Sequence, residues 1–155
     1  MTVELDSSDR AILTLLQRNA RISNVELAKQ VHLSPPATHA RVKQLESKGV
    51  IKNYVAMLDR EQTGHDCMCF ISVSLELHRT DKQQEFFNII RNLPEVLECY
   101  HLTGESDYLL KVVIRNNREM EQFITQSLLP IPGMARVHTS VVLREIKSDT
   151  SLSMS

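Results

Sequence analysis

The chain has 155 residues, of which 42% are hydrophobic and 24% charged, as in ordinary globular proteins. No apolar run approaches the roughly 18 residues that a membrane helix needs, and the polar, acidic N-terminus is unlike a secretory signal. We therefore expect a cytoplasmic protein. The net charge of -1 hides an asymmetry, because residues 1–58 hold eight basic and five acidic side chains and the remainder holds ten and fourteen. So small a basic excess indicates nucleic-acid binding only together with a motif.

Three cysteines, Cys67, Cys69 and Cys99, are an odd number and lack the second Cys/His pair of a zinc site. We interpret them as reduced thiols of the core, with Cys67 and Cys69 on one face of a strand. A metal or redox role is the alternative. Neither a cofactor nor a metal site is expected.

The apolar residues follow helical spacing up to about residue 50. A first helix is expected to start at Asp6 and a second at Ser23, whose side chains can accept hydrogen bonds from the free N–H groups of the first turn. A third begins at Ser34 and ends near Gly49. The tight connection between the second and third predicts a helix-turn-helix. Residues 50–58 are typical of a short strand, where winged variants place their wing.

From Cys67 onward the pattern alternates between strands and helices. Strands are expected at 69–78, 96–103, 108–115 and 134–146, with helices at 80–93 and 116–128. This β-α-β-β-α-β order predicts an antiparallel sheet with both helices on one face, so the fold class is α+β. The last strand is apolar on both sides. We expect the second face of the sheet to be covered by another copy of the chain or, alternatively, by its own N-terminal domain.

Residues 59–66 are polar and include Gly64, which is typical of a linker. The predicted organisation is a helix-turn-helix domain at 1–58, a linker at 59–66 and a second domain at 67–155.

Short segments of both domains form a recognisable series. The first domain carries Leu5-Asp6, Asn19-x-Arg21-x-Ser23, Glu26-Leu27-Ala28, Arg41-Val42-Lys43-x-Leu45-Glu46 and Gly49-Val50-Ile51, and the second carries Pro94-Glu95-Val96, Thr103–Leu110 and Glu145-Ile146-Lys147. In order and spacing they resemble the Lrp/AsnC (feast/famine) transcription regulators, over about residues 5–152. The resemblance implies a (winged) helix-turn-helix domain and a ferredoxin-like (RAM/ACT-like) domain that binds a small amino acid. It also implies homodimers that assemble into higher oligomers, such as an octamer.

The third helix is the expected reader of double-stranded DNA. Its side with Thr38 and Leu45 faces the other two helices, so the opposite side is free to enter the major groove. Small alanines permit close approach to a thymine methyl, Gln44 can pair with adenine, and Lys43 can bond guanine or phosphate. The candidate DNA-binding residues are Ser34, Pro36, Ala37, His39, Ala40, Arg41, Lys43 and Gln44.

Two of these candidates have equally ordinary alternatives. Arg41 can send its guanidinium to a phosphate, or it can form an ion pair with Glu46 or Asp9 inside the domain. His39 can contact DNA or lie on a solvated flank.

The turn at 103–107 has the chemistry that an amino acid requires, because backbone N–H groups near Gly104 can hold a carboxylate and Asp107 can hold the ammonium. A plain hairpin turn is the alternative. The resemblance places the effector at this loop, between adjoining dimers. The candidate effector-binding residues are Tyr100, Leu102, Thr103, Gly104, Glu105, Ser106 and Asp107, with His138, Thr139 and Ser140 as further walls.

An enzyme is not expected, since no Ser, Cys or His lies in a recognisable nucleophile context and the six histidines are scattered singly. An architectural DNA-binding protein without an effector is the alternative function.

Overall fold

The computed structural model describes residues 3–76 and 80–154, which form two compact units. The first unit consists of two segments, one ending at Met57 and one starting at Lys147, and the second unit is Leu58–Ile146. The C-terminal segment therefore packs with the first unit, although it follows the second in sequence. None of the described helices is long and apolar enough to span a membrane.

The first unit contains three helices, α1 Ser7–Arg18, α2 Asn24–Gln30 and α3 Pro35–Ser47. Asp6 caps α1 and accepts a hydrogen bond from the Asp9 N–H at 2.8 Å, and Ser23 caps α2 by accepting from the Glu26 N–H at 3.1 Å. The predicted starts of both helices are confirmed. The core of the unit is formed by Ile12, Leu13, Leu27, Ala28 and Leu45.

The turn between α2 and α3 is stabilised by a left-handed residue. His32 has a φ of 56°, its N–H lies 3.4 Å from the Lys29 carbonyl, and the Leu33 N–H lies 3.0 Å from the Ala28 carbonyl. These paired bonds form a Schellman motif, which ends a helix abruptly. Gly49, with a φ of 70°, ends α3 in the same way. The first motif ends α2 and the second ends α3.

The prediction of a strand at 50–58 is wrong for this structure. The described residues of this segment form no strand, because a strand requires a hydrogen-bonded neighbour and the chain supplies none there. Tyr54, Val55, Met57 and Leu58 are instead between 47% and 74% exposed. Asp59 follows and closes an ordered turn, because its carboxylate accepts hydrogen bonds from the N–H groups of Glu61 and Gln62.

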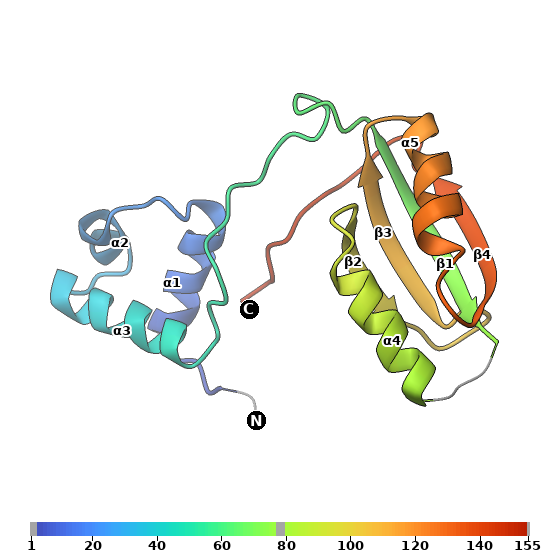
Figure 1. Cartoon of the computed structure of the whole chain (residues 1–155). Helices are drawn as coiled ribbons and strands as arrows, with labels where there is room; N and C mark the ends of the chain where they lie inside the picture. The colour runs from blue at the N-terminus through green and yellow to red at the C-terminus, as the bar shows by residue number, and fades with distance from the viewer. Residues whose placement is uncertain (1–2, 77–79, 155) are drawn as a thin grey trace. The chain divides into compact units, whose positions relative to one another are not determined.

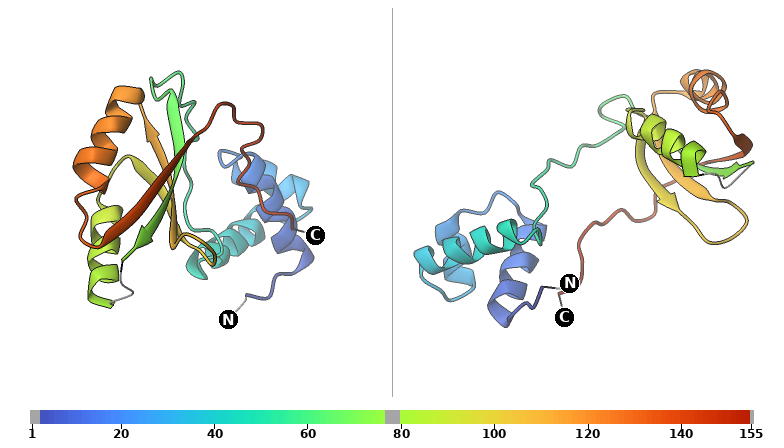
Figure 2. Two further views of the ribbon diagram at one scale, coloured as in Figure 1. Left: turned by 90° about the vertical axis from the view of Figure 1, so that its right-hand side faces the viewer. Right: turned by 60° about the horizontal axis from the view of Figure 1, so that its bottom comes forward.

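The second unit is the predicted α+β sheet. Its elements are β1 Cys67–Leu75, α4 Thr80–Arg91, β2 Val96–His101, β3 Tyr108–Ile114, α5 Asn117–Gln122, the π-helix η1 Phe123–Leu128 that continues α5, and β4 Met134–Val141. The antiparallel strands lie in the order β2-β3-β1-β4. Both α4 and α5 cover the same face of the sheet (Figures 1 and 2), which confirms the prediction.

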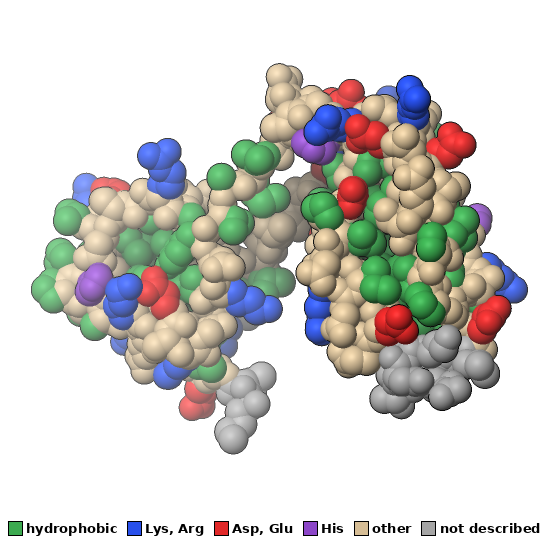
Figure 3. All heavy atoms as spheres, viewed as in Figure 1, with side chains coloured by type: hydrophobic (Ala, Val, Ile, Leu, Met, Phe, Trp, Pro, Cys, Tyr) green, Lys and Arg blue, Asp and Glu red, His purple; other side chains and the backbone are tan. Residues whose placement is uncertain are grey.

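The core of the second unit lies between this face and the helices. Ile71, Val73 and Leu110 are completely buried, as are Phe86 of α4 and Leu128 of η1. Further hydrophobic side chains gather over α4 and α5 (Figure 3).

Two of the three cysteines belong to this core, as predicted. Cys67 and Cys69 are buried and share the helix-covered face, and burial raises the pKa of the Cys69 thiol to about 11. Cys99 is exposed because it lies on the edge strand β2, so the prediction of a third core thiol is wrong.

All four strands end earlier than predicted, with β2 ending at His101 rather than 103, β3 at Ile114 rather than 115 and β4 at Val141 rather than 146. β4 ends at Val141, which pairs with Cys69, and the Val142 N–H makes a last bond to the Met68 carbonyl. Residues 143–146 form no strand, although β1 begins at Cys67, two residues before the last position that pairs with β4. β1 itself ends at Leu75, and the predicted strand positions 77 and 78 lie outside the described residues.

Candidate DNA-binding helix and effector loop

One side of α3 is bare to solvent. Thr38 and Leu45 are 0% and 3% exposed and face the core, whereas the opposite side is open. The exposed residues are Pro36, Ala37, His39, Ala40, Lys43, Gln44 and Ser47. The predicted orientation of the helix is therefore confirmed, and this side can approach another molecule without rearrangement.

The N-terminus of α3 is tightly held. Ser34 caps it, with its Oγ 3.4 Å from the Ala37 N–H, and the Asn24 side chain donates to the Pro35 carbonyl at 2.8 Å. Pro35 and Pro36 carry no N–H. A phosphate at this end therefore meets fewer backbone donors than at an ordinary helix N-terminus.

Arg41 forms a double ion pair inside the unit. Its Nη1 lies 2.7 Å from Asp6 Oδ2 and 2.9 Å from Asp9 Oδ1. The backbone N–H of Asp9 and the Arg41 guanidinium together hold the pKa of the Asp6 carboxyl below its usual range. Of the two ion-pair partners considered from the sequence, Asp9 is present. The other, Glu46, pairs with Lys43 instead.

Lys43 belongs to a polar cluster beside the exposed side of α3. Its Nζ lies 2.8 Å from Glu46 Oε2, and the Tyr54 hydroxyl donates to Glu46 Oε1 at 3.0 Å. Lys43 and then Tyr54 lower the pKa of Glu46. The Lys43 side chain is 63% exposed, so it can turn toward a phosphate at little cost. The sequence analysis did not identify Tyr54 as part of this cluster. The contact between Lys43 and Glu46 could have been predicted from their i,i+3 spacing on the helix.

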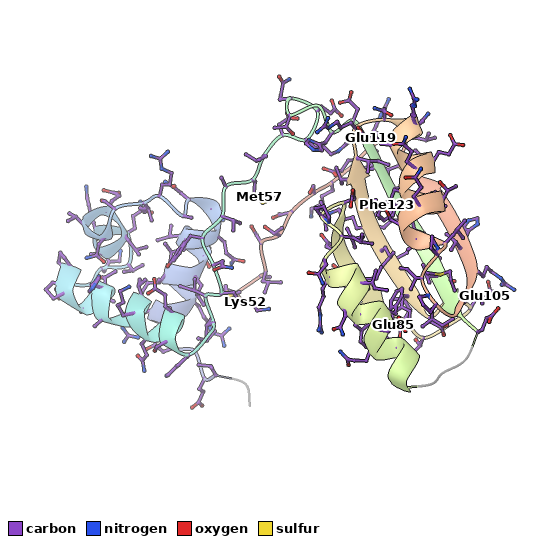
Figure 4. All side chains as sticks on the ribbon, in the orientation of Figure 1. Lys52, Met57, Glu85, Glu105, Glu119 and Phe123 are labelled. Carbon is purple, nitrogen blue, oxygen red and sulfur yellow. The ribbon has the colours of Figure 1, made fainter. Side chains whose placement is uncertain are left out.

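The loop at 103–107 connects β2 to β3 and is anchored at Asp107. The Asp107 N–H donates to the Val73 carbonyl at 2.9 Å, and its carboxylate Oδ2 accepts from the Leu75 N–H at 2.8 Å. Gly104 has a φ of 139°. Thr103, Gly104 and Glu105 are exposed. Glu105 lies at the end of the second unit away from Glu119 (Figure 4). The loop is thus open, and its aspartate already has a structural task.

The strand register shows which expected effector residues lie together. Tyr100, Leu109, Ser72 and His138 form one row across the four strands on the helix-free face, and Ser140 lies in the next row. Thr139 pairs with the buried Ile71, so its side chain points to the helix-covered face instead. Leu102 follows β2 and is 39% exposed.

A second polar cluster accompanies Tyr100 on the helix-free face. The Tyr100 hydroxyl donates to Glu98 Oε2 at 2.5 Å, and Lys111 Nζ lies 3.1 Å from Glu98 Oε1. These bonds lower the pKa of Glu98, and the carboxylate raises the pKa of Tyr100. Sequence reasoning did not single out Glu98 or Lys111. The alternation along β2, which places Glu98 beside Tyr100, was the available signal.

Within the described ranges, no group of three or more His, Cys, Asp or Glu side chains is arranged to hold a metal ion.

Comparison with known proteins assigns both units. A family model described as "Lrp/AsnC ligand binding domain" matches residues 68–152, and one described as "Winged helix-turn-helix DNA-binding" matches residues 5–52. The chain belongs to the Lrp/AsnC family.

Curated relatives agree with this assignment over more than nine tenths of their length. The transcriptional regulator AzlB of Bacillus subtilis is 36% identical over 98% of this chain and 97% of its own. The leucine-responsive regulatory protein of Escherichia coli is 36% identical over 96% and 91%.

Solved structures of the Lrp/AsnC family share the fold. A transcriptional regulator of Neisseria meningitidis in complex with L-Met has a TM-score of 0.92 and 40% identity, with 96% of each chain covered. Escherichia coli AsnC has a TM-score of 0.89 and 30% identity, covering 96% of this chain and 99% of its own.

This Lrp/AsnC protein is therefore a transcriptional regulator with a DNA-binding helix-turn-helix, and its relatives are regulators rather than enzymes. The resemblance noted in the sequence is confirmed. α3 lies within the matched DNA-binding segment, and the loop at 103–107 lies within the matched ligand-binding domain.

Proposed function

We propose that this cytoplasmic Lrp/AsnC regulator reads duplex DNA with the exposed side of α3 and responds to a small amino acid at the 103–107 loop. The observation that carries the proposal is the bare side of α3, opposite the buried Thr38 and Leu45. A helix with a small, open face and a fixed inner face fits the major groove without moving its own core.

The residues on that side divide by chemistry. Ala37 and Ala40 let the helix approach closely, Gln44 offers an amide for adenine, and Lys43 offers a cation for guanine or phosphate. Ser34, Pro36 and His39 flank this centre. Arg41 is held by two carboxylates in the free protein, and its contribution to DNA binding is to fix the helix rather than to meet a phosphate.

The loop supplies complementary groups for an amino acid. Exposed backbone around Gly104, with Thr103, Glu105 and Ser106, can donate to a carboxylate, and Asp107 has a second carboxylate oxygen beside the one that Leu75 uses. Tyr100, His138 and Ser140 share one face of the sheet near the loop. The L-Met complex of the Neisseria meningitidis relative supports a small amino acid as the ligand class.

An open loop needs a cover to hold a small ligand tightly. We infer that a second copy of the chain provides it, within a homodimer that assembles further. Binding at such an interface changes the assembly equilibrium and thereby the DNA half-sites that are engaged together.

Selection from a random duplex library, followed by titration of the selected duplex, tests DNA reading. Ala40→Asp should lower the affinity at least about tenfold, since it places a carboxylate toward the phosphates. Arg91→Gln, an exposed charge change on α4, is the matched control. Equal affinities of the wild type and Ala40→Asp would remove α3 from the interface.

A melting-temperature screen with the twenty amino acids tests the effector. A ligand that binds only the folded state raises the midpoint, by an amount that grows with its concentration. If no amino acid shifts the midpoint while DNA binding is intact, the protein acts as an architectural DNA-binding protein.

A further inference from the structure

The end of the chain folds back onto the DNA-binding unit. We call residues 147–154 the tail. It follows β4 and residues 142–146, yet it belongs to the same compact unit as α1, α2 and α3. The end of the chain approaches α1 in Figures 1 and 2. The two units are therefore joined twice by the chain, once at Met57–Leu58 and once at Ile146–Lys147.

Gln17 of α1 binds the main chain of the tail. The Leu152 N–H donates to Gln17 Oε1 at 2.6 Å, and Gln17 Nε2 donates to the Leu152 carbonyl at 3.0 Å. One side-chain amide thus satisfies both backbone groups of one residue, as a neighbouring strand does in a sheet. The Leu152 side chain is 71% exposed and takes no part in this recognition. Gln17 therefore selects an extended backbone at this point.

Two further contacts fix the direction of the tail. Met154 is partly buried and packs against the core cluster of Ile12, Leu13, Leu27 and Leu45. Ahead of the Gln17 contact, Asp149 Oδ1 accepts from the Ser151 N–H at 2.8 Å and closes a local turn. A backbone clamp and an apolar side chain thus both hold the tail on the first unit.

A groove lies between the tail and α1. Thr14, Gln17 and Arg18 form one wall of a groove of about 630 Å³, and the tail forms the other. Asp149, Ser151, Leu152 and Ser153 are all exposed. A segment with so few buried contacts can detach while the three-helix core remains folded.

We propose that the tail is a reversible strap that docks on α1 and transmits the state of the effector domain to the DNA-binding unit. This inference rests on the proposed function. β4, which leads into the strap, carries His138 and Ser140 on the same face as Tyr100. A displacement of β4 at the effector site is passed along residues 142–146 to the tail, and the Gln17 clamp delivers it to α1. The connection at Met57–Leu58 leads instead into β1.

Docking can be measured directly because the chain contains no tryptophan. Leu152→Trp places one indole on an exposed position of the strap. Adding Gln17→Ala should lower its steady-state fluorescence anisotropy, since the clamp is lost and the tail moves freely. Adding Gln62→Ala, at an exposed glutamine outside the groove, should leave it unchanged. Equal anisotropy with and without Gln17 would overturn the docking.

Coupling is tested with full-length protein, a duplex selected from a random library, and L-methionine or L-leucine as probe. In Gln17→Ala, and in a chain ended after Lys147, the change in DNA affinity caused by the amino acid should shrink at least threefold. The rise in melting temperature with the amino acid should persist. Far-UV circular dichroism tests whether both variants are folded. If the shortened chain is not folded, Gln17→Ala alone still tests the coupling.

A full effect of the amino acid on DNA affinity in folded Gln17→Ala overturns the strap. So does a wild type that binds the amino acid without any change in DNA affinity. Failure of the proposed function looks different, because then no amino acid stabilises even the wild type, and both proposals fall together.

Discussion

Nη1 of Arg41, in the middle of α3, lies 2.7 Å from Oδ2 of Asp6, the residue that caps α1. A second bond to Asp9 Oδ1, at 2.9 Å, completes the link between the two helices. The candidate reading helix is therefore fixed to the start of α1 by charge as well as by the apolar core. This arrangement determines how the first unit should respond to acid and to salt.

Acid should weaken the first unit through Asp6. Its pKa is depressed by the Asp9 N–H and by Arg41, from an ordinary value of 3.8. A carboxyl group whose pKa is lower in the folded state stabilises the fold fully at a pH above its pKa in the unfolded state. This stabilisation is lost as the pH falls through its pKa in the folded state. The free energy of unfolding should therefore drop below about pH 3.8. Asp6→Asn, which keeps a capping oxygen, should be less stable than the wild type at pH 7 and equally stable well below pH 3. Urea unfolding followed by circular dichroism across this range gives the comparison, and a constant difference between the two proteins would contradict the role of the charge.

Arg41 and Lys43 should differ in how they contribute to DNA binding. Neutralising a residue that meets a phosphate lowers the slope of log K against log salt by about 1. We expect this loss for Lys43→Gln, whose side chain is 63% exposed. For Arg41→Gln we expect a lower melting temperature and an almost unchanged slope, because Asp6 and Asp9 occupy the guanidinium. Fluorescence titrations at several salt concentrations measure both slopes. If the slope of log K against log salt falls by about 1 for Arg41→Gln as well, Arg41 contacts a phosphate directly.

The two helix ends with left-handed residues offer a stability test without charge. His32→Val should lower the free energy of unfolding by about 1–2 kcal/mol, since a β-branched residue is poorly tolerated at a φ of 56°. Gly49→Ala should lower the free energy of unfolding by about 1 kcal/mol through the backbone conformation alone. No atom lies within 4 Å of the added Cβ, so a steric clash does not contribute. Lys48→Ala, at the adjacent exposed C-cap, is the control and should change little. An unaltered Gly49→Ala would mean that the turn relaxes to another conformation.

Local chemistry explains why most of the fold could be predicted from the sequence. Asp6, Ser23 and Ser34 cap their helices in the structure, and Gly49 ends the third. Each of these signals depends on residues only a few positions apart, so the sequence alone is sufficient to predict it. Alternation likewise predicted that Cys67 and Cys69 share one face of β1, and that face is buried.

What failed depended on partners distant in sequence. The expected strand at 50–58 has no hydrogen-bonded neighbour in the chain, and β4 ends at Val141 although its apolar pattern continues to residue 146. Alternation along the last strand places Thr139 and His138 on opposite faces, but only the register with β1 shows that Thr139 lies on the helix-covered one. The clamp between Gln17 and Leu152 joins residues 135 positions apart, so no local pattern announces it.

The effector loop can be tested by separating two tasks of Asp107. Its Oδ2 accepts the Leu75 N–H at 2.8 Å and holds the loop on β1, and its charge is proposed to meet the ammonium of the effector. Asp107→Asn keeps an acceptor for Leu75 but removes the charge. We expect the variant to stay folded and to bind the amino acid at least about tenfold more weakly, since a hydrogen bond to a charged group contributes about 1.5–3 kcal/mol. Asp107→Ala should in addition lower the free energy of unfolding by about 1–3 kcal/mol, because the Leu75 N–H then lacks its partner.

Isothermal titration with the amino acid found in the melting screen, together with urea unfolding, reads both effects of these variants. Glu121→Gln removes an equal charge from an exposed site on α5 and should leave both unchanged. Undiminished binding by Asp107→Asn would leave Asp107 with its structural role alone. The ammonium would then have to be held by another acceptor of the loop, and Glu105, exposed two residues away, is the next to substitute.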